Sequence, residues 1–396
     1  MDSLFSDRIA DVPRSFIREI LKTALQPNVI SFAGGLPNRD LFPVKEIAEA
    51  ARKVLDREGR DVFQYGNSEG SVKLREFIAR RYESRLGLQV AVDDILITNG
   101  SQQGLDLLGK VLLNEGDGLI IEEPGYLGAI QAFSLYRPRF LPVPLVQEGL
   151  DTAVLKQTLA QSRPKLLYTV PNFQNPSGIT YSRGNRQAVA EAVRESGALL
   201  IEDDPYGDLR FSGEPAPSFR TYLPQTTILL GSFSKSVVPG FRLGWIVAPR
   251  PLMDKLVIAK QAADLHTSHM IQAIMHQYLA DNDIDQHIQT IRDAYGKQCA
   301  AMLAGMERHF PNSVTHTRPE GGMFVWAELP RGLAALDLFE LAVKENVVFV
   351  PGDPFYVNKS RTRAMRINFS CVDESTIAAG IERLGNVMKR MIEQTG

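Results

Sequence analysis

A lysine, two serines and an arginine lie close together in the middle of this chain, at spacings that suit a phosphate group held beside a reactive amine. Lys235 follows an apolar run, 227–230, that we interpret as a buried strand. It therefore lies just beyond the carboxyl end of that strand, where open α/β sheets bind ligands. Ser232 and Ser234 offer hydroxyl groups and Arg242 a guanidinium group, while a lysine amine can form an imine with a carbonyl compound. Taken alone, a solvated loop with surface charges explains this segment equally well.

Polar and aromatic residues also follow the other strands that we expect. The sequence places Ser101 and Gln102 after 95–98, Tyr126 after 119–121, and Asn175 after 166–170. Two acids, Asp203 and Asp204, and then Tyr206 follow 199–202. Each group has a simple structural explanation, such as a serine at the start of a helix or a solvated acidic turn. Because the carboxyl ends of neighbouring parallel strands meet at one edge of a sheet, the groups together indicate a single ligand-binding crevice.

Short apolar runs alternate with helical segments through most of the chain, and this alternation predicts a parallel sheet covered by helices on both faces. We expect helices at 72–86 and 101–113 between the first strands. The start of the second helix would offer backbone N–H groups and the Ser101 hydroxyl to an anion.

A second, smaller part of the chain is expected after a long helical stretch at 251–278. Its elements are mixed, with strands at 321–328 and 347–350. Asp373 stands where it can cap a final amphipathic helix. We therefore expect a domain boundary within the long helical stretch.

The charge balance argues against some classes of partner. The chain has 396 residues, is 44% hydrophobic, and carries 44 Lys and Arg against 46 Asp and Glu, for a net charge of −2. A chain without a strong field of one sign is not expected to bind nucleic acid or an anionic membrane. No uninterrupted run of about 18 apolar residues occurs, and no targeting segment is evident.

The cysteines and histidines indicate no metal site. Cys299 and Cys371 lie far apart without a partner motif, which suits a reducing compartment, so we expect a cytoplasmic protein. His266, His269 and His276 follow one another at helical spacing, but no acid pair lies near them. Walker, dinucleotide-binding and Gly-x-Ser-x-Gly motifs are absent from the sequence.

Together the motifs resemble those of a known enzyme family. They are Gly-Ser-Gln-Gln-Gly at 100–104, Asn-Pro-Ser-Gly at 175–178, Asp-Asp-Pro-Tyr at 203–206, Ser-Phe-Ser-Lys at 232–235 and Arg-Ile-Asn-Phe-Ser at 366–370. This set is similar to the pyridoxal-phosphate-dependent enzymes of fold type I. Among these it resembles the class I/II aminotransferases, and most of all the 2-aminoadipate and kynurenine aminotransferase branch. The resemblance runs from about Ile17 to the C-terminal helix.

The resemblance implies an α/β fold with two domains. The large domain would hold a mostly parallel, seven-stranded sheet flanked by helices, and the smaller α+β domain would combine the C-terminal part with the N-terminal segment. The expected division is an N-terminal segment at 1–45 near the substrate site, a large cofactor-binding domain at 46–275 and a small domain at 276–396. A homodimer with shared active sites is also implied, with Tyr65 reaching the cofactor phosphate of the neighbouring subunit.

The resemblance also implies how the cofactor, pyridoxal 5'-phosphate, is used. Lys235 would carry it covalently and then move a proton as general base and acid. Asp203, three residues before Tyr206 as in the family, would keep the pyridine nitrogen protonated. Asn175 and Tyr206 would bind the phenolic oxygen of the ring, and Tyr126 would stack on its face.

Two further groups of ligands follow from the same resemblance. The phosphate would be held by Ser101, Gln102, Ser232, Ser234 and Arg242. The substrate would be bound by Arg366, Asn175, Gly35 and Arg18, and Arg366 would clamp the substrate α-carboxylate because a guanidinium group binds it in a bidentate manner.

The implied activity is transfer of an α-amino group between an amino acid, such as 2-aminoadipate, leucine or an aromatic amino acid, and 2-oxoglutarate by a ping-pong mechanism. A pyridoxal-phosphate-dependent lyase or decarboxylase stays open as an alternative, because the cofactor motifs do not determine which bond at Cα breaks. The effector domain of a transcription regulator is a weaker alternative, since the resemblance begins by about residue 15 and leaves no space for a DNA-binding module.

Arg18 resembles the position that meets a distal substrate carboxylate in the aminoadipate branch, whereas Phe16, Leu36 and Phe355 could form an apolar pocket. If Arg18 binds that carboxylate, Arg18→Ala should lower the rate with 2-aminoadipate roughly 10-fold more than the rate with leucine, because a charged hydrogen bond is lost with only one of the two donors. The ratio of initial rates with the two donors measures this. An unchanged ratio would sink the hypothesis.

Overall fold

The computed structural model describes residues 4–10, 20, 28–358 and 361–394. Among these residues the largest sheet has eight strands in the order β2-β9-β8-β7-β6-β3-β4-β5. The strands are β2 (Ile95–Asn99), β9 (Leu243–Val247), β8 (Thr227–Ser232), β7 (Leu199–Asp203), β6 (Leu166–Thr169), β3 (Gly118–Glu123), β4 (Arg139–Val146) and β5 (Gly149–Leu150). Strands β8, β7, β6, β3 and β4 pair in parallel, whereas β9 is antiparallel to both of its neighbours. The mostly parallel sheet is confirmed, and the eighth strand, β5, is a two-residue addition at its edge.

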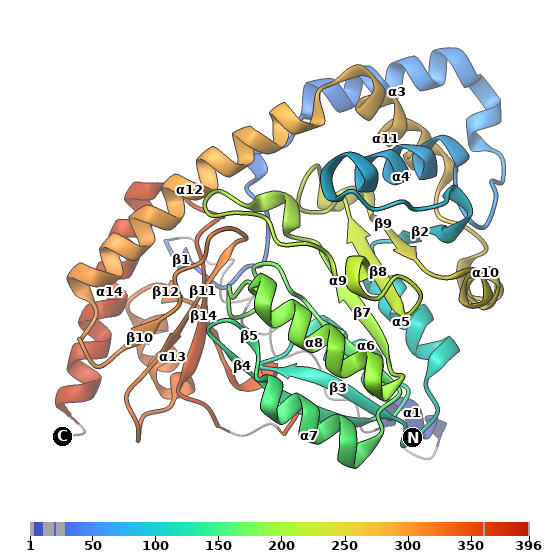
Figure 1. Ribbon diagram of the computed structural model, residues 1–396. Coiled ribbons are helices and arrows are strands. Elements are labelled where there is room, and N and C mark those ends of the chain that lie inside the picture. Colours follow the sequence, from blue (N-terminus) through green and yellow to red (C-terminus); the bar gives the residue numbers. More distant parts are fainter. Residues whose placement is uncertain (1–3, 11–19, 21–27, 359–360, 395–396) are drawn as a thin grey trace.

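Helices cover both faces of this sheet because successive strand residues point in opposite directions. Leu96 packs in a cluster with α5 (Ser101–Leu112) and α6 (Leu127–Ser134), while its neighbours Ile95 and Ile97 face α3 (Val44–Glu58) and α4 (Val72–Leu86). Further along the sheet, Ile120 and Leu167 pack against α7 (Thr152–Ser162) and α8 (Arg183–Ser196). A short helix, α9 (Phe219–Tyr222), completes that layer. Figure 1 shows these layers, with the sheet between them.

Three sequence-based expectations need correction. The run at 347–350 is not one strand, because Val347–Val348 and Val350–Pro351 are separate strands in different sheets. The stretch at 251–278 is not one helix but two, α10 (Arg250–Asp264) and α11 (His269–Asp281). The break occurs at Leu265, whose backbone is left-handed with φ 68°, and Ser268 then caps α11 by accepting a hydrogen bond from the Ile271 amide. The strands β4 and β9 were not expected at all.

A long helix, α12 (Ile284–His309), leads from the large sheet to the second part of the chain (Figure 1). There β10 (Thr315–His316), β11 (Phe324–Glu328), β14 (Ala364–Asn368) and β13 (Val350–Pro351) form an antiparallel sheet in that order. The helices α13 (Ala335–Lys344) and α14 (Glu374–Glu393) accompany it, and Asp373 caps α14 as the sequence predicted. No helix among the described residues is long and apolar enough to cross a membrane.

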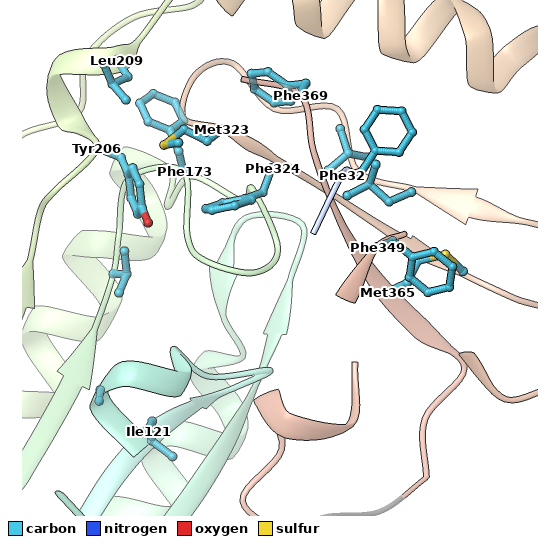
Figure 2. Packing of buried hydrophobic residues seen from close by; sticks show 14 of the residues in the cluster. Phe32, Ile121, Phe173, Tyr206, Leu209, Met323, Phe324, Phe349, Met365 and Phe369 are labelled. Atoms are coloured by element: carbon cyan, nitrogen blue, oxygen red, sulfur yellow. The ribbon is translucent and has the colours of Figure 1, made fainter. Parts of the chain in front are cut away.

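The N-terminal segment joins this second part. The strand β1 (Ile30–Ser31) pairs in parallel with β12 (Val347–Val348), and the Phe32 amide donates a hydrogen bond to the Val348 carbonyl. The hydrophobic core is continuous between the two parts: Figure 2 shows Tyr206 and Phe173 of the large sheet's loops beside Phe324 of β11. Their packing fixes the second part against the carboxyl ends of the central strands.

From the contact between the N-terminal segment and α14, we predict how a substitution at Gly380 changes the stability of the protein. A Cβ atom at Gly380 would lie 2.5 Å from Phe32 Cζ and 2.8 Å from Ile30 Cγ2, and the fully buried Phe32 has no space to move. Gly380→Val should therefore lower the free energy of unfolding by about 2 kcal/mol through overpacking. Ala378→Val, at an exposed position of the same helix, should cost only about 0.6 kcal/mol of helix propensity. Urea unfolding measures both, and equal losses would contradict this packing.

Candidate active site

A cavity of about 460 Å³ lies where the carboxyl ends of the central strands meet the second part of the chain. The sequence-predicted residues that line it are Gly35, Ser101, Gln102, Tyr126, Asn175, Asp203, Tyr206, Ser232, Ser234, Lys235, Arg242 and Arg366. Its charged lining residues are Lys235, Arg242, Arg366 and Asp203, so positive charges exceed negative ones by two. This excess favours an anionic ligand.

Lys235 follows β8 and reaches across the cavity to the N-terminal segment. Its Nζ atom donates a hydrogen bond to the Gly35 carbonyl oxygen at 2.8 Å. Loss of hydration, aided by the positive charge of Arg366, lowers the pKa of Lys235 to about 8. About half of these amines are therefore neutral near pH 8, and a neutral amine is the form that attacks a carbonyl group or takes a proton.

Asp203 is the last residue of β7 and is 1% exposed. Its Oδ2 atom accepts a hydrogen bond from the Tyr168 hydroxyl at 2.7 Å, whereas its Oδ1 atom is buried without a partner. Burial raises the pKa of Asp203 to about 7, although the hydrogen bond from Tyr168 acts in the opposite direction. The neighbouring Asp204 is engaged elsewhere, because it accepts hydrogen bonds from Asn172 Nδ2 and the Gly207 amide, each at 2.9 Å.

Hydroxyl groups and a helix start gather at another side of the cavity. Ser101 opens α5, and no side chain caps the amides of this helix, so the positive end of its dipole is available to an anion. Ser232 Oγ donates to Ser234 Oγ at 2.9 Å. Gly100 has φ 74°, and a Cβ atom there would lie 2.6 Å from Arg242 Nη2. A glycine at this position therefore allows the Arg242 guanidinium group to approach the helix start.

Arg366 of β14 is held between two aromatic rings. Its guanidinium carbon lies 4.5 Å from the ring centre of Phe324 and 5.3 Å from that of Phe355. Its Nη1 donates to Asn175 Oδ1 at 2.9 Å and its Nη2 to the Ala33 carbonyl at 2.8 Å. Burial lowers the pKa of Arg366 to about 10, so the group stays charged at neutral pH. The guanidinium plane is thus fixed beside Asn175, in the same cavity as Lys235.

Two tyrosines complete the polar lining. Tyr206 Oη accepts a hydrogen bond from Asn175 Nδ2 at 3.4 Å. Burial raises the pKa of Tyr206 and raises that of Tyr126 to about 12, so both hydroxyl groups stay protonated at neutral pH. A Cβ atom at Gly128 would lie 2.6 Å from the Tyr126 hydroxyl, so the chain leaves this ring just enough space beside the start of α6.

Some predicted residues lie elsewhere. Tyr65 does not line the cavity: it is 78% exposed, and its ring makes an edge contact with His266. Arg18 and Phe16 lie outside the described residues. The expected apolar residues Leu36 and Phe355 do line the cavity.

Sequence reasoning did not single out Tyr168, nor the lining residues Leu127, Gln131 and Val170. Tyr168 stands in an apolar strand run, where a tyrosine is most simply a core residue.

The residues present fit pyridoxal phosphate, the cofactor that the sequence implied. The decisive observation is Asp203 Oδ1, a buried carboxylate oxygen without a partner that a protonated ring nitrogen would satisfy. The hydroxyl groups, the start of α5 and Arg242 suit a phosphate group, and Lys235 supplies the amine. The assignment of each of these residues to a role remains a prediction.

Comparisons with known proteins agree with this chemistry. The family model described as aminotransferase class I and II matches residues 27–384. A 2-aminoadipate transaminase of Thermus thermophilus is 42% identical over 96% of this chain and 95% of its own length, and an aromatic-amino-acid aminotransferase of Thermococcus litoralis is 39% identical over 99% and 96%. The crystal structure of an α-aminoadipate aminotransferase from Thermus thermophilus, complexed with N-(5'-phosphopyridoxyl)-L-leucine, superposes with a TM-score of 0.92 and 41% identity over 99% of each chain.

The lowered pKa of Lys235 predicts how the cofactor-free protein captures pyridoxal phosphate. Because only the neutral amine reacts, the rate of covalent capture should rise with pH and reach half its maximum near pH 8, the pKa of Lys235. An ordinary lysine would give a midpoint near pH ~10.4. Stopped-flow absorbance after mixing with the cofactor measures this rate, and Lys235→Arg is the control that keeps the charge without the reaction. A midpoint above pH ~10 would contradict the assignment.

Proposed function

This chain belongs to the aminotransferase class I and II family and is a pyridoxal-phosphate-dependent aminotransferase, and we propose that it exchanges the amino group of a bulky amino acid with 2-oxoglutarate by a ping-pong mechanism. The donors we propose are 2-aminoadipate, leucine and aromatic amino acids. One observation carries the proposal: Arg366 is 3% exposed, held in place by Phe324 and Phe355, and lines the same cavity as Lys235. A fixed guanidinium group next to a neutral amine suits an α-amino acid.

The residues of the chain perform distinct steps in this proposal. Arg366 and Asn175 hold the α-carboxylate, which fixes the position of the substrate Cα. Lys235 would take the proton from the substrate Cα and deliver it to C4′ of the cofactor, and would move it in the opposite direction when the acceptor reacts. Its pKa of about 8 suits both directions near neutral pH. When bound, pyridoxal phosphate supplies an electron sink that stabilises negative charge at Cα.

Other residues hold and tune the cofactor. Asp203 would keep a proton on the ring nitrogen by accepting its hydrogen bond, and Asn175 and Tyr206 would bind the phenolic oxygen. Tyr126 would stack on the ring. The phosphate would be held by Ser101, Gln102, Ser232, Ser234 and Arg242. Because the oxo acid formed from the donor leaves before 2-oxoglutarate binds, Arg366 would bind the carboxylate of each substrate in turn.

The remaining lining supports a broad range of donors. Leu36, Leu127 and Phe355 offer apolar contacts, and Gln131 adds one amide. Among the described lining residues, the cations Lys235, Arg242 and Arg366 already have proposed roles. None of these residues therefore supplies a further positive charge to bind a distal carboxylate of the substrate. Arg18 therefore stays the proposed partner of such a carboxylate. The names of the relatives, which cover 2-aminoadipate and aromatic substrates, support the same range.

The proposal includes the organisation of the protein. The pairing of β1 with β12 supports an N-terminal segment, 1–45, that belongs with a small domain at 276–396 rather than with the large domain at 46–275. Tyr65 is exposed and does not line the cavity of its own chain. This supports a homodimer in which Tyr65 reaches the phosphate site of the partner subunit. Sedimentation should then give twice the mass of one chain. Two free cysteines support a cytoplasmic location.

Amino transfer is tested by incubating the protein with leucine or 2-aminoadipate and 2-oxoglutarate and measuring glutamate against released ammonia. We expect one glutamate for each donor consumed. Arg366→Lys should raise the KM of both donor and acceptor roughly 10-fold or more, because an ammonium group cannot form the two parallel hydrogen bonds to a carboxylate.

The matched control is Arg363→Lys, an exposed arginine just before β14 that pairs with Glu328, and it should leave both KM values unchanged. Ammonia without glutamate would contradict amino transfer. An unchanged KM in Arg366→Lys would contradict the carboxylate clamp.

A further inference from the structure

Tyr168 lies directly behind the acid that is proposed to hold the cofactor ring. It stands on β6, the strand next to β7, and pairs in register with Ile201, two residues before Asp203. Side chains two residues apart on a strand share a face, so Tyr168 and Asp203 point to the same side of the sheet. The Tyr168 hydroxyl donates to Asp203 Oδ2 at 2.7 Å, and both residues are buried.

Because of this contact, the two oxygens of the Asp203 carboxylate have different surroundings. Oδ2 is occupied by Tyr168, while Oδ1 has no partner within the described residues and is left for a ligand in the cavity that Asp203 lines. Tyr168 is not among the residues lining that cavity, and its ring packs edge-on against Phe133 with 5.9 Å between ring centres. Its hydroxyl group therefore has a direct hydrogen bond to Asp203 but lines no part of the cavity itself.

The direction of the effect follows from the chemistry of the pair. A hydrogen bond donated to a carboxylate stabilises its charged form, and the contact with Tyr168 lowers the pKa of Asp203 against the effect of burial. Burial and the charge of Asp203 raise the pKa of Tyr168 far above its usual value, so the hydroxyl group remains a donor. A more acidic Asp203 leaves the shared proton on the ring nitrogen of the cofactor.

We propose that Tyr168 is a positioning residue for the cofactor: its hydroxyl group orients the Asp203 carboxylate, with one oxygen left for the ring nitrogen, and keeps that carboxylate charged. The inference rests on the role proposed for Asp203. Through it, Tyr168 supports catalysis without touching substrate or cofactor.

The chain offers a closely matched control in Tyr181. This residue is also fully buried, and its hydroxyl donates to a buried carboxylate, Glu122 Oε1, at the same distance of 2.7 Å. Glu122 does not line the cavity. Tyr168→Phe and Tyr181→Phe therefore each delete one oxygen and one hydrogen bond to a buried carboxylate, but only the first removes a hydrogen bond that Asp203 accepts.

The test compares the two variants and Asp203→Asn as holoenzymes, by titrating the visible absorbance of the bound cofactor with pH. A positive ring nitrogen disfavours a second proton on the cofactor. In Tyr168→Phe the ring nitrogen should be less fully protonated, so the midpoint of the absorbance titration should move to higher pH. Asp203→Asn should move the midpoint in the same direction and further. The kcat of Tyr168→Phe should fall roughly 10-fold with KM within about twofold, since a hydrogen bond to a charged group is lost. Tyr181→Phe should leave the midpoint in place.

The outcomes separate the possible failures. If Tyr168→Phe and Tyr181→Phe lower the urea midpoint of unfolding alike and neither moves the absorbance midpoint, Tyr168 is merely structural and the inference is overturned. If Asp203→Asn leaves the absorbance midpoint unmoved, the role proposed for Asp203 fails first. In the Asp203→Asn background, Tyr168→Phe should cause no further shift. An additive shift there would show that Tyr168 acts by another route and would overturn the inference.

Discussion

The removal of opposite charges from water in one cavity is the constraint on which the site depends. Asp203 and Arg366 are 1% and 3% exposed, and each keeps one buried polar atom without a partner, Oδ1 and Nε respectively. Such burial costs free energy unless hydrogen bonds replace the lost water. The pKa values respond accordingly, upward for Asp203 and downward for Arg366 and Lys235. The cavity is therefore preorganised for ligands that complete these contacts.

Excluding water requires the two parts of the chain to close on each other. The large sheet supplies Lys235, whose amine reaches the Gly35 carbonyl of the N-terminal segment, and the second part supplies Arg366, whose guanidinium group reaches the Ala33 carbonyl. The same short segment thus links both cations to β12 through the pairing of β1. The segment therefore closes one side of the cavity and holds the Lys235 amine in place.

The sequence predicted the central strands well because their signals are local. The apolar run at 95–98 became β2, and Asp373 caps its helix as expected. The prediction was weaker where local signals mislead. Pro142 and Pro144 argue against a strand, yet β4 tolerates them because β5 pairs with it only at Leu145 and Val146, which leaves much of its outer edge open.

By itself, the sequence determined which residues stand at the ends of the strands, because apolar runs and the polar turns after them are local patterns. Ser101 and Lys235 were identified in this way, as was the acid pair Asp203 and Asp204, from which the family resemblance selected Asp203. Only the tertiary structure decided what surrounds them: that Tyr168 holds Asp203, and that Phe324 and Phe355 enclose Arg366. These contacts join residues on different strands or distant segments. The packing of the sheet and of the second part, rather than any local pattern, brings such residues together and removes their charges from water.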